Sequence, residues 1–288
     1  YFLKIFIENS LNNHNRMKSE LAFINLLNEN YFDNIPNIVF YNIKKNWILY
    51  DWVSGKKIDQ IDKSDSQELI DFLCKINLNK LKKNFPNASE ACFSILEHKH
   101  LINSKIERSI SKLMLIKDVD NNLISQAVEA LKRKQYLLQN IFSEQYQLNK
   151  KIIEDKLESH QKCLSPSDIG FHNILDSQGK LIFLDFEYAG IDDPCKLIAD
   201  IILQPDHGIP KSNIYLLKKL IISIKSDIPQ FEERLKIILE LYKIKWFCII
   251  FNPVIKDNIN IENINHCIKK RISKSSEYFL EIESKKIE

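Results

Sequence analysis

Three polar residues in the segment 164–190, LSPSDIGFHNILDSQGKLIFLDFEYAG, have types and spacing that suit a metal-dependent reaction centre. Asp168 precedes Asn173 by five positions, and a hairpin is predicted between Asn173 and Asp185. Such a hairpin brings Asn173 and Asp185 to adjacent strand ends, with Asp168 in the loop before them. Asn and Asp oxygens are hard ligands that suit Mg²⁺. The remaining carboxylate, that of Asp168, can act as a base toward a hydroxyl group. The predicted hairpin consists of strand 174–175, turn 176–179 and strand 181–184.

A lysine and a glutamate near the start of the chain add to this set. The alternating residues 1–7 predict a strand with Lys4 at its centre, and helical spacing over 15–29 predicts a helix that carries Glu20. Taken singly, a strand lysine is more often an edge residue, and a helix glutamate more often lies on a solvent-exposed face. Together, a strand lysine and a helix glutamate match the ion pair that positions nucleotide phosphates in kinases.

The catalytic loop of a kinase needs the same three residue types as segment 164–190. It uses a base for the acceptor hydroxyl, and an Asn and an Asp that hold the metal on the phosphates. An Asp and an Asn five positions apart mean little alone in a chain rich in both, so the hairpin context carries the interpretation. Residues 48–55, ILYDWVSG, then predict an apolar strand that runs into a connection whose exposed backbone can bond an adenine.

On these residues, the chain resembles the aminoglycoside phosphotransferase / choline kinase family, small-molecule kinases with a protein-kinase-like fold. The catalytic-loop pattern of that family, His-Gly-Asp-x4-Asn-Ile-Leu, is similar to residues 166–175, PSDIGFHNIL. Its Ile-Asp-Phe-Glu metal motif is similar to residues 184–187, LDFE. The resemblance covers most of the chain and is strongest at 164–205.

The resemblance implies a phosphotransferase that uses ATP and Mg²⁺ and acts on a hydroxyl of a sugar, amino sugar or amino alcohol. An Asp that braces the catalytic loop in the family falls best on Asp200, with Asp193 as the alternative. The other implied site residues are Asp168 as the catalytic base, Asn173 and Asp185 as metal ligands, Lys4 and Glu20 at the phosphates, and the Asp51 carbonyl and Val53 amide at the adenine.

Several positions depart from the family pattern. Pro166 replaces its His, Ser167 replaces its Gly, and His172 stands directly before Asn173. We interpret His172 as a partly exposed loop residue, with substrate contact as the alternative. The family also has two strands and a glycine-rich loop before the strand lysine. Because the chain opens at Tyr1 on an apolar segment, we expect that residues are missing upstream.

These departures keep a second function open. An active small-molecule kinase is favoured because the Lys, Asp, Asn and Asp set is intact. The alternative is a pseudokinase that binds nucleotide or a partner without phosphotransfer, which the substitution at Pro166 supports. A helical scaffold with an accidental motif is a weaker possibility. A protein kinase is disfavoured because no Ala-Pro-Glu segment follows Asp185.

The expected fold class is α+β, in a two-lobed protein-kinase-like arrangement. A small β-rich N-terminal lobe, truncated at its start, is expected over residues 1–54, and a large, mainly helical lobe over 55–288. The strand-like runs of the first lobe are 36–41 and 47–53. The predicted helices of the second lobe are 66–81, two or three long helices within 88–160, and 195–204, 211–225, 229–251 and 262–285.

Composition excludes several other classes of protein. The 288 residues carry a net charge of only +3, which does not indicate a nucleic-acid partner. No apolar run has the length of a membrane span, and no secretory signal is visible, so a cytoplasmic location is expected. The six scattered cysteines predict reduced thiols and no structural zinc.

The expected partner is a small-molecule acceptor, and nothing in the sequence indicates the oligomeric state. Segments 88–160 and 206–260 are expected to shape the acceptor pocket. Four aromatic residues are candidates for its walls, although core packing is favoured for aromatics at helical spacing: Tyr188, Trp246, Phe247 and Phe251.

Overall fold

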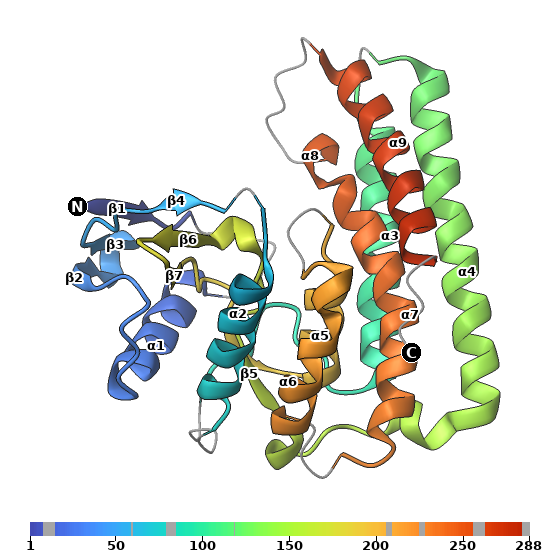
Figure 1. The fold of residues 1–288 in the computed structure, drawn as a ribbon. Helices are drawn as coiled ribbons and strands as arrows, with labels where there is room; N and C mark the ends of the chain where they lie inside the picture. The colour runs from blue at the N-terminus through green and yellow to red at the C-terminus, as the bar shows by residue number, and fades with distance from the viewer. Residues whose placement is uncertain are drawn as a thin grey trace. The chain divides into compact units, whose positions relative to one another are not determined.

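The structure is a computed structural model, and it divides the chain into two compact units. Unit 1 contains Tyr1–Ala91 and Leu157–Pro229, and unit 2 contains Cys92–Lys156 and Gln230–Glu288. Figure 1 shows the helices and strands of both units. The described residues are 1–7, 15–58, 60–78, 85–117, 119–205, 209–224, 228–255 and 263–283.

Unit 1 begins with an antiparallel sheet of three strands. The strands are β1 (Phe2–Ile5), β2 (Ile38–Asn42) and β3 (Trp47–Tyr50), and β3 lies between the other two. Lys4 of β1 is paired with Ile48 of β3. All three strands were predicted, but β3 ends at Tyr50 and residues 51–55 form an irregular connection rather than a longer strand.

Helix α1 (Arg16–Glu29) packs with one face buried. Its N-cap is Asn15, whose side chain accepts a hydrogen bond from the Lys18 amide at 2.8 Å. Met17, Glu20, Ile24 and Leu27 are all buried, and their spacing of three and four residues puts them on one face. Glu20 therefore does not lie on a solvent-exposed face, because it shares the stripe that the apolar residues bury.

Helix α2 (Lys63–Ile76) starts earlier than the predicted helix over 66–81. Asp62 and Asp65 form a capping box, in which each side chain accepts a hydrogen bond from the backbone amide of the other. This reciprocal pair satisfies two backbone donors at the start of the helix, so the helix can begin at Lys63 although its first large apolar residue is Leu69. The helix also ends earlier than predicted, at Ile76 with Asn77 as its C-cap, and residues 79–81 of the prediction lie outside the described residues.

The predicted hairpin is present as β6 (Ile174–Ser177) and β7 (Lys180–Phe183), with a two-residue turn in place of the four-residue turn predicted over 176–179. Its two turn residues, Gln178 and Gly179, have φ values of 58° and 82°, which suit a tight type I′ hairpin turn. Two further strand pairs were not predicted. Strand β4 (Lys56–Lys57) pairs with β6, and β5 (Cys163–Ser165) pairs with β8 (Gly190–Asp192).

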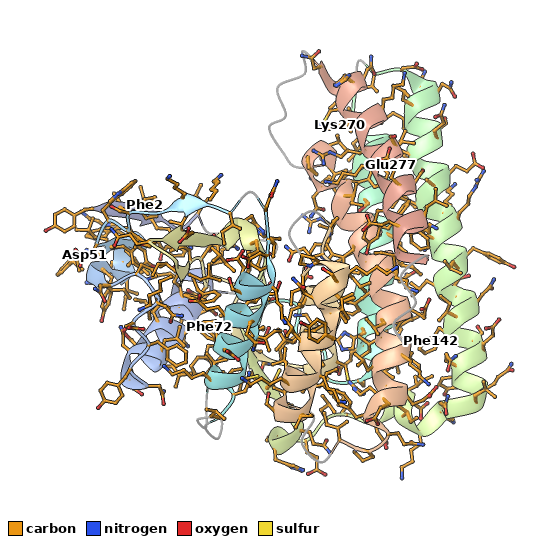
Figure 2. All side chains as sticks on the ribbon, viewed as in Figure 1. Phe2, Asp51, Phe72, Phe142, Lys270 and Glu277 are labelled. Atoms are coloured by element: carbon orange, nitrogen blue, oxygen red, sulfur yellow. The ribbon has the colours of Figure 1, made fainter. Side chains whose placement is uncertain are left out.

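An aromatic cluster ties α1, α2 and the hairpin together. The rings of Phe72 and Phe183 stack at 4.0 Å between centroids, and the rings of Phe23 and Phe186 lie 5.1 Å apart. Phe72 lies among the packed side chains of unit 1 in Figure 2. The cluster includes Phe186, which directly follows Asp185, so core packing fixes the chain beside that carboxylate. Unit 1 also contains α5 (Pro194–Leu203) and α6 (Leu217–Ile224).

A buried ion cluster lies where β8 leads into α5. Lys196 forms an ion pair with Asp192 and lies 3.6 Å from Asp200, and all three side chains are almost fully buried. Burial lowers the pKa of Lys196, but the charges of Asp192 and Asp200 outweigh this effect and raise it. Lys196 is therefore the cation that balances two carboxylates in the interior of unit 1.

Replacing Lys196 by Met is expected to lower the free energy of unfolding by about 3–5 kcal/mol, because the substitution removes the cation that pairs with the buried carboxylates of Asp192 and Asp200. Urea denaturation monitored by circular dichroism measures the change. The matched control is Lys219→Met, which removes an exposed pair with Asp71 at 2.5 Å and should change stability little. Equal effects of the two substitutions would show that the buried cluster has no special role in stability.

Unit 2 is a helical bundle. Helices α3, α4, α7 and α9 pack against one another, and short α8 packs on α3, α7 and α9. Residues 88–160 thus contain two long helices, α3 and α4, and α4 is a bundle element rather than a coiled coil, as predicted. Their bounds are α3 (Ile95–Met114), α4 (Asn121–Glu154), α7 (Phe231–Ile250), α8 (Asn252–Ile255) and α9 (Ile264–Glu283).

The aromatic candidates for an acceptor pocket have different environments. Phe247 and Phe251 are buried in unit 2 with their ring centroids 5.7 Å apart, which confirms the core interpretation for both. Trp246 and Tyr188 are partly exposed. Part of the expected pocket segment 206–260 lies outside the described residues. Among the helices that the structure describes, none combines the length and apolar character needed to cross a membrane.

Candidate functional site

A pocket of about 510 Å³ lies entirely within unit 1. Its walls come from β1, α1, the end of β3, the connection 51–55, β4 and the hairpin. Its apolar lining includes Phe2, Pro36, Val53, Leu175 and Leu184. Its polar lining includes Lys4, Glu20, Asp51, Asn173 and Asp185. The structure thus gathers six of the seven predicted site residues around one pocket, and the seventh, Asp168, contacts the pocket residues Asn173 and His172.

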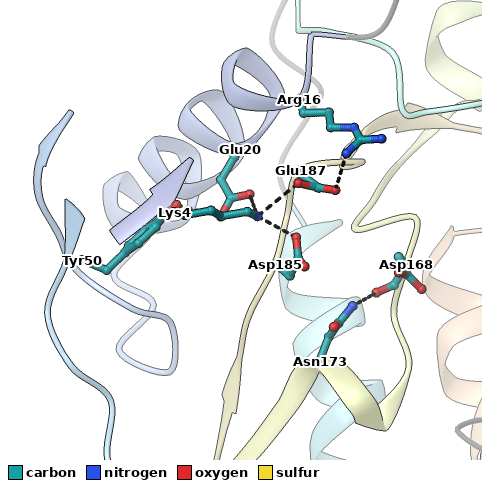
Figure 3. Close-up of polar contacts among 8 residues, drawn as sticks. All are labelled: Lys4, Arg16, Glu20, Tyr50, Asp168, Asn173, Asp185 and Glu187. Carbon is teal, nitrogen blue, oxygen red and sulfur yellow. Dashed lines mark hydrogen bonds and ion pairs between the residues drawn. The ribbon is translucent and has the colours of Figure 1, made fainter. Parts of the chain in front are cut away.

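The ammonium group of Lys4 lies among three carboxylates, as Figure 3 shows. Its Nζ is 2.6 Å from Glu20 Oε2, 2.7 Å from Asp185 Oδ1 and 3.4 Å from Glu187 Oε2. The edge position of β1 does not leave this side chain in solvent, because only 17% of it is exposed. Arg16 reaches the other oxygen of Glu187 at 3.4 Å.

The charges of this cluster are set by burial and by one another. Burial lowers the pKa of Lys4, but Glu20 and Asp185 raise it above its usual value, so the ammonium stays charged. Tyr50 donates a hydrogen bond to Glu20 Oε1 at 2.7 Å. Burial and the neighbouring Glu20 carboxylate raise the pKa of Tyr50, which keeps its hydroxyl a donor. One carboxylate oxygen of Glu20 therefore accepts a hydrogen bond from Tyr50, and the other accepts one from Lys4.

Asp185 and Asn173 are placed by the hairpin. Ile174 pairs with Phe183, and beyond that pair the Leu184 amide donates to the Asn173 carbonyl at 2.9 Å. Backbone pairing of the hairpin thus extends to Asn173 and Leu184. It places the predicted metal ligand Asn173 close to Asp185, which directly follows Leu184. Asp185 has φ of 62°, a left-handed conformation that is uncommon for residues other than glycine. Such local strain is found where the surrounding structure holds a functional side chain in place.

Asp168 lies in a tight loop that the side chains of its neighbours close. The Asn173 side-chain amide donates to the Asp168 main-chain carbonyl at 3.0 Å, and the Ser167 amide donates to Ser165 Oγ at 2.9 Å. The Asp168 carboxylate is 38% exposed and lies 3.5 Å from His172 Nε2. The contact of His172 with this carboxylate was not foreseen. His172 lies four residues after Asp168, in the 3-10 turn Phe171–Asn173, and the sequence carried no signal for that turn.

The connection 51–55 lines the pocket through Asp51, Trp52, Val53 and Gly55. The Asp51 amide donates to the Asn37 carbonyl at 3.0 Å, which ties the connection to the chain just before β2. Adenine contacts through the Asp51 carbonyl and the Val53 amide remain a prediction, as do the roles of the other predicted residues.

The side chains suit a divalent cation of the Mg²⁺ type. Asn173 and Asp185 offer hard oxygen donors, and the Asp185 side chain is 43% exposed toward the pocket. Carboxylate oxygens of Glu20, Asp185 and Glu187 also lie within 4.8 Å of one another. Glu187 was not assigned a role from the sequence. Its position two residues after Asp185 in the LDFE motif was the available signal, although the chain is not an extended strand at these residues.

The predicted brace residues lie elsewhere in unit 1. Asp193 is the N-cap of α5 and accepts a hydrogen bond from the Cys195 amide at 2.8 Å. Asp200 belongs to the buried Lys196 cluster. The β5–β8 pair, in which Leu164 faces Ile191, connects this region to the strand that precedes the loop carrying Asp168. A bracing role for Asp200 therefore remains a prediction.

Several solved structures have folds similar to this one. A spectinomycin phosphotransferase with ADP and spectinomycin bound gives a TM-score of 0.57 at 11% identity, over 93% of this chain and 84% of that chain. An ADP-bound aminoglycoside phosphotransferase, APH(2'')-Ib, gives 0.53 at 14% identity, over 96% and 87%. The choline kinase LicA from Streptococcus pneumoniae gives 0.52 at 14% identity, over 95% and 84%. No family model and no curated protein matches the sequence.

The chain has the fold of these small-molecule kinases. The predicted α+β kinase-like fold, with a small β-rich part and a large helical part, is therefore confirmed. At identities of 11–14% the likeness concerns the fold, so the chemistry has to be argued from the residues that line the pocket.

Proposed function

We propose that this protein is a small-molecule kinase that transfers the γ-phosphate of ATP to a hydroxyl of a sugar, amino sugar or amino alcohol. The observation that carries the proposal is the position of the Lys4 ammonium. It lies within 2.7 Å of carboxylate oxygens of both Glu20 and Asp185, at a pocket whose other walls are largely apolar. An apolar pocket with a fixed cation suits a nucleotide base joined to phosphates.

In the proposed complex, the base lies against the connection 51–55 and the phosphates lie toward Lys4. Glu20 holds Lys4, and Lys4 contacts the α- and β-phosphates. Asn173 and Asp185 would hold Mg²⁺, which neutralises charge on the phosphates when it is bound. Because phosphoryl transfer has a loose transition state, positioning and charge neutralisation supply most of the catalysis.

Asp168 acts on the acceptor. Its carboxylate accepts a hydrogen bond from the acceptor hydroxyl and orients the oxygen toward the γ-phosphorus. A bond forms between that oxygen and phosphorus while the bond from phosphorus to the β-phosphate oxygen breaks, and ADP leaves. The hydroxyl proton passes to Asp168 as transfer completes. The Asn173 side chain donates a hydrogen bond to the Asp168 main-chain carbonyl, which fixes the loop that carries Asp168 beside the proposed metal position.

The acceptor is best sought among compounds related to those of the structural neighbours. Spectinomycin, other aminoglycosides, choline, ethanolamine and simple sugars make up the panel. ATP and GTP are each supplied with Mg²⁺, and ADP or GDP formation and phosphorylated product are measured on the full chain. We expect transfer to one chemical class of the panel.

Other outcomes of the panel decide against the proposal. Tight nucleotide binding without transfer to any acceptor would favour a pseudokinase. Absence of any Mg²⁺-dependent thermal stabilisation by ATP or GTP would overturn the assignment of the pocket itself, because a ligand that binds the folded state must raise its melting temperature.

A further inference from the structure

Two adjacent lysines of β4, Lys56 and Lys57, have different environments. Lys57 lines the unit 1 pocket, whereas Lys56 is not among its lining residues. Strand β4 is antiparallel to β6, with Lys57 opposite Leu175 and Lys56 opposite Asp176. Residues directly opposite one another in such a pair project to the same face of the sheet, and successive residues project to opposite faces.

The faces of this small sheet therefore separate the two lysines. Leu175 lines the pocket, so its partner Lys57 shares the pocket face. Lys56 shares the opposite face with Asp176, whose carboxylate accepts the Gly179 amide in the hairpin turn. Both lysine residues are exposed. They differ in the face of the sheet to which their side chains project, and not in their burial.

Close packing at Gly55 fixes the position of β4. A Cβ atom at Gly55 would lie 2.9 Å from the Cβ of Leu175 and 3.0 Å from the carbonyl oxygen of Asp176. Only a residue without a side chain can approach β6 so closely. The chain thus enters β4 in direct contact with the hairpin. Lys57 therefore lies opposite β6, the strand that begins directly after the proposed metal ligand Asn173.

Lys57 can reach the phosphate region from this position. Leu175 is two residues from Asn173, which corresponds to about 7 Å along a strand, and neighbouring strands lie about 4.8 Å apart. The flexible four-carbon stem of a lysine can cover most of such a separation. Lys57 can therefore direct its ammonium toward phosphates held near Asn173 while its stem lies along Leu175.

The electrostatic balance of the pocket calls for a second cation. Lys4 is shared among Glu20, Asp185 and Glu187, and Arg16 pairs with Glu187, so both of these cations already face carboxylates. The Lys57 side chain, in contrast, forms no ion pair or hydrogen bond among the residues that the structure describes. A polyphosphate that enters the pocket thus meets Lys4, whose ammonium is already paired with carboxylates, and Lys57, whose side chain is not.

We propose that Lys57 is a second phosphate-binding residue of the pocket, which contacts the phosphates of a nucleoside di- or triphosphate opposite Lys4. The inference rests on the proposed function, because it requires that a nucleotide occupies this pocket. It goes beyond that function by naming a residue that sets affinity for the phosphates and not for the base.

The test compares Lys57→Gln with the matched control Lys56→Gln in the full chain. Isothermal titration calorimetry measures binding of ADP, ATP and adenosine at constant Mg²⁺. We expect Lys57→Gln to weaken ADP and ATP binding about tenfold, the effect of losing one charge-assisted hydrogen bond, and to leave adenosine binding unchanged. Lys56→Gln should match the wild type with all three ligands. The difference between the variants should shrink in about 1 M KCl, where the Debye length is about 3 Å.

Each alternative outcome is decisive. Equal affinities of the two variants for ADP would overturn the role of Lys57 while leaving the proposed kinase intact. Equal weakening of ADP and adenosine by Lys57→Gln would overturn the phosphate assignment, since the residue would then act on the nucleoside. Failure of the wild type to bind any of the three ligands would remove the proposed function as well, so the two failures are distinguishable.

Discussion

Replacement of Asp168 by asparagine is expected to reduce phosphate transfer by about three orders of magnitude and to leave ADP binding close to that of the wild type. The proposed base loses its ability to accept the hydroxyl proton, whereas the nucleotide-binding residues are unchanged. The asparagine has nearly the same size, so the loop that carries it should keep its shape.

The structure supports this separation of effects. The Asn173 side chain is bonded to the main-chain carbonyl of Asp168 and not to its carboxylate. A change in the Asp168 side chain therefore leaves the bond that links the loop to the hairpin in place. The contact that changes is the one between the carboxylate and His172, at 3.5 Å.

Transfer is measured with the acceptor that the panel identifies, and ADP affinity by calorimetry. The control is Asp176→Asn, the same chemical change in the hairpin turn, where the asparagine oxygen can still accept the Gly179 amide. The control should transfer phosphate at the wild-type rate. If Asp168→Asn retained more than about a tenth of the wild-type rate, Asp168 would not be the base.

Replacement of Asp185 by asparagine is expected to remove the increase in ADP affinity that Mg²⁺ confers, a loss of at least about tenfold. The substitution removes the charged oxygen donor from the proposed metal position. It also removes one of the three carboxylates around Lys4, whose ammonium is 2.7 Å from Asp185 Oδ1. Lys4 is then freer to contact phosphate directly.

These two effects have opposite signs, which makes the result specific. In the presence of a chelator, Asp185→Asn should bind ADP as tightly as the wild type or more tightly. In the presence of Mg²⁺, the wild type should gain affinity and the variant should not. Calorimetric titration of ADP under both conditions, with Asp176→Asn as the control, measures the difference. An equal gain from Mg²⁺ in the variant would exclude Asp185 as a metal ligand.

Much of the local structure followed from the sequence, because its signals are local. The alternation around Lys4, the helical spacing of Met17, Ile24 and Leu27, and the Gln178-Gly179 turn each depend on residues within one or two turns of chain. The order Asp168, Asn173, Asp185 along a loop and hairpin has the same origin. These features were predictable since neighbouring residues alone decide them.

Features that depend on pairing between distant segments were missed. Strand β8 contains only Gly190–Asp192 and exists because β5 lies beside it. Strand β4 contains two lysines, which have low strand propensity, and exists because Gly55 lets the chain approach β6. Neither segment carries a pattern of its own that distinguishes it from a loop.

The charged groups show the same division. The sequence by itself determined which residues can supply a base, metal ligands and a phosphate-binding cation, because the residue type fixes the chemistry of the side chain. Only the tertiary structure decided that Lys4 meets Asp185 across 181 positions, that Glu187 joins them, and that Lys57 rather than Lys56 faces the pocket. The physical reason is that packing of the aromatic core and the strand ladders sets the directions of these side chains, and residue order alone does not contain those directions.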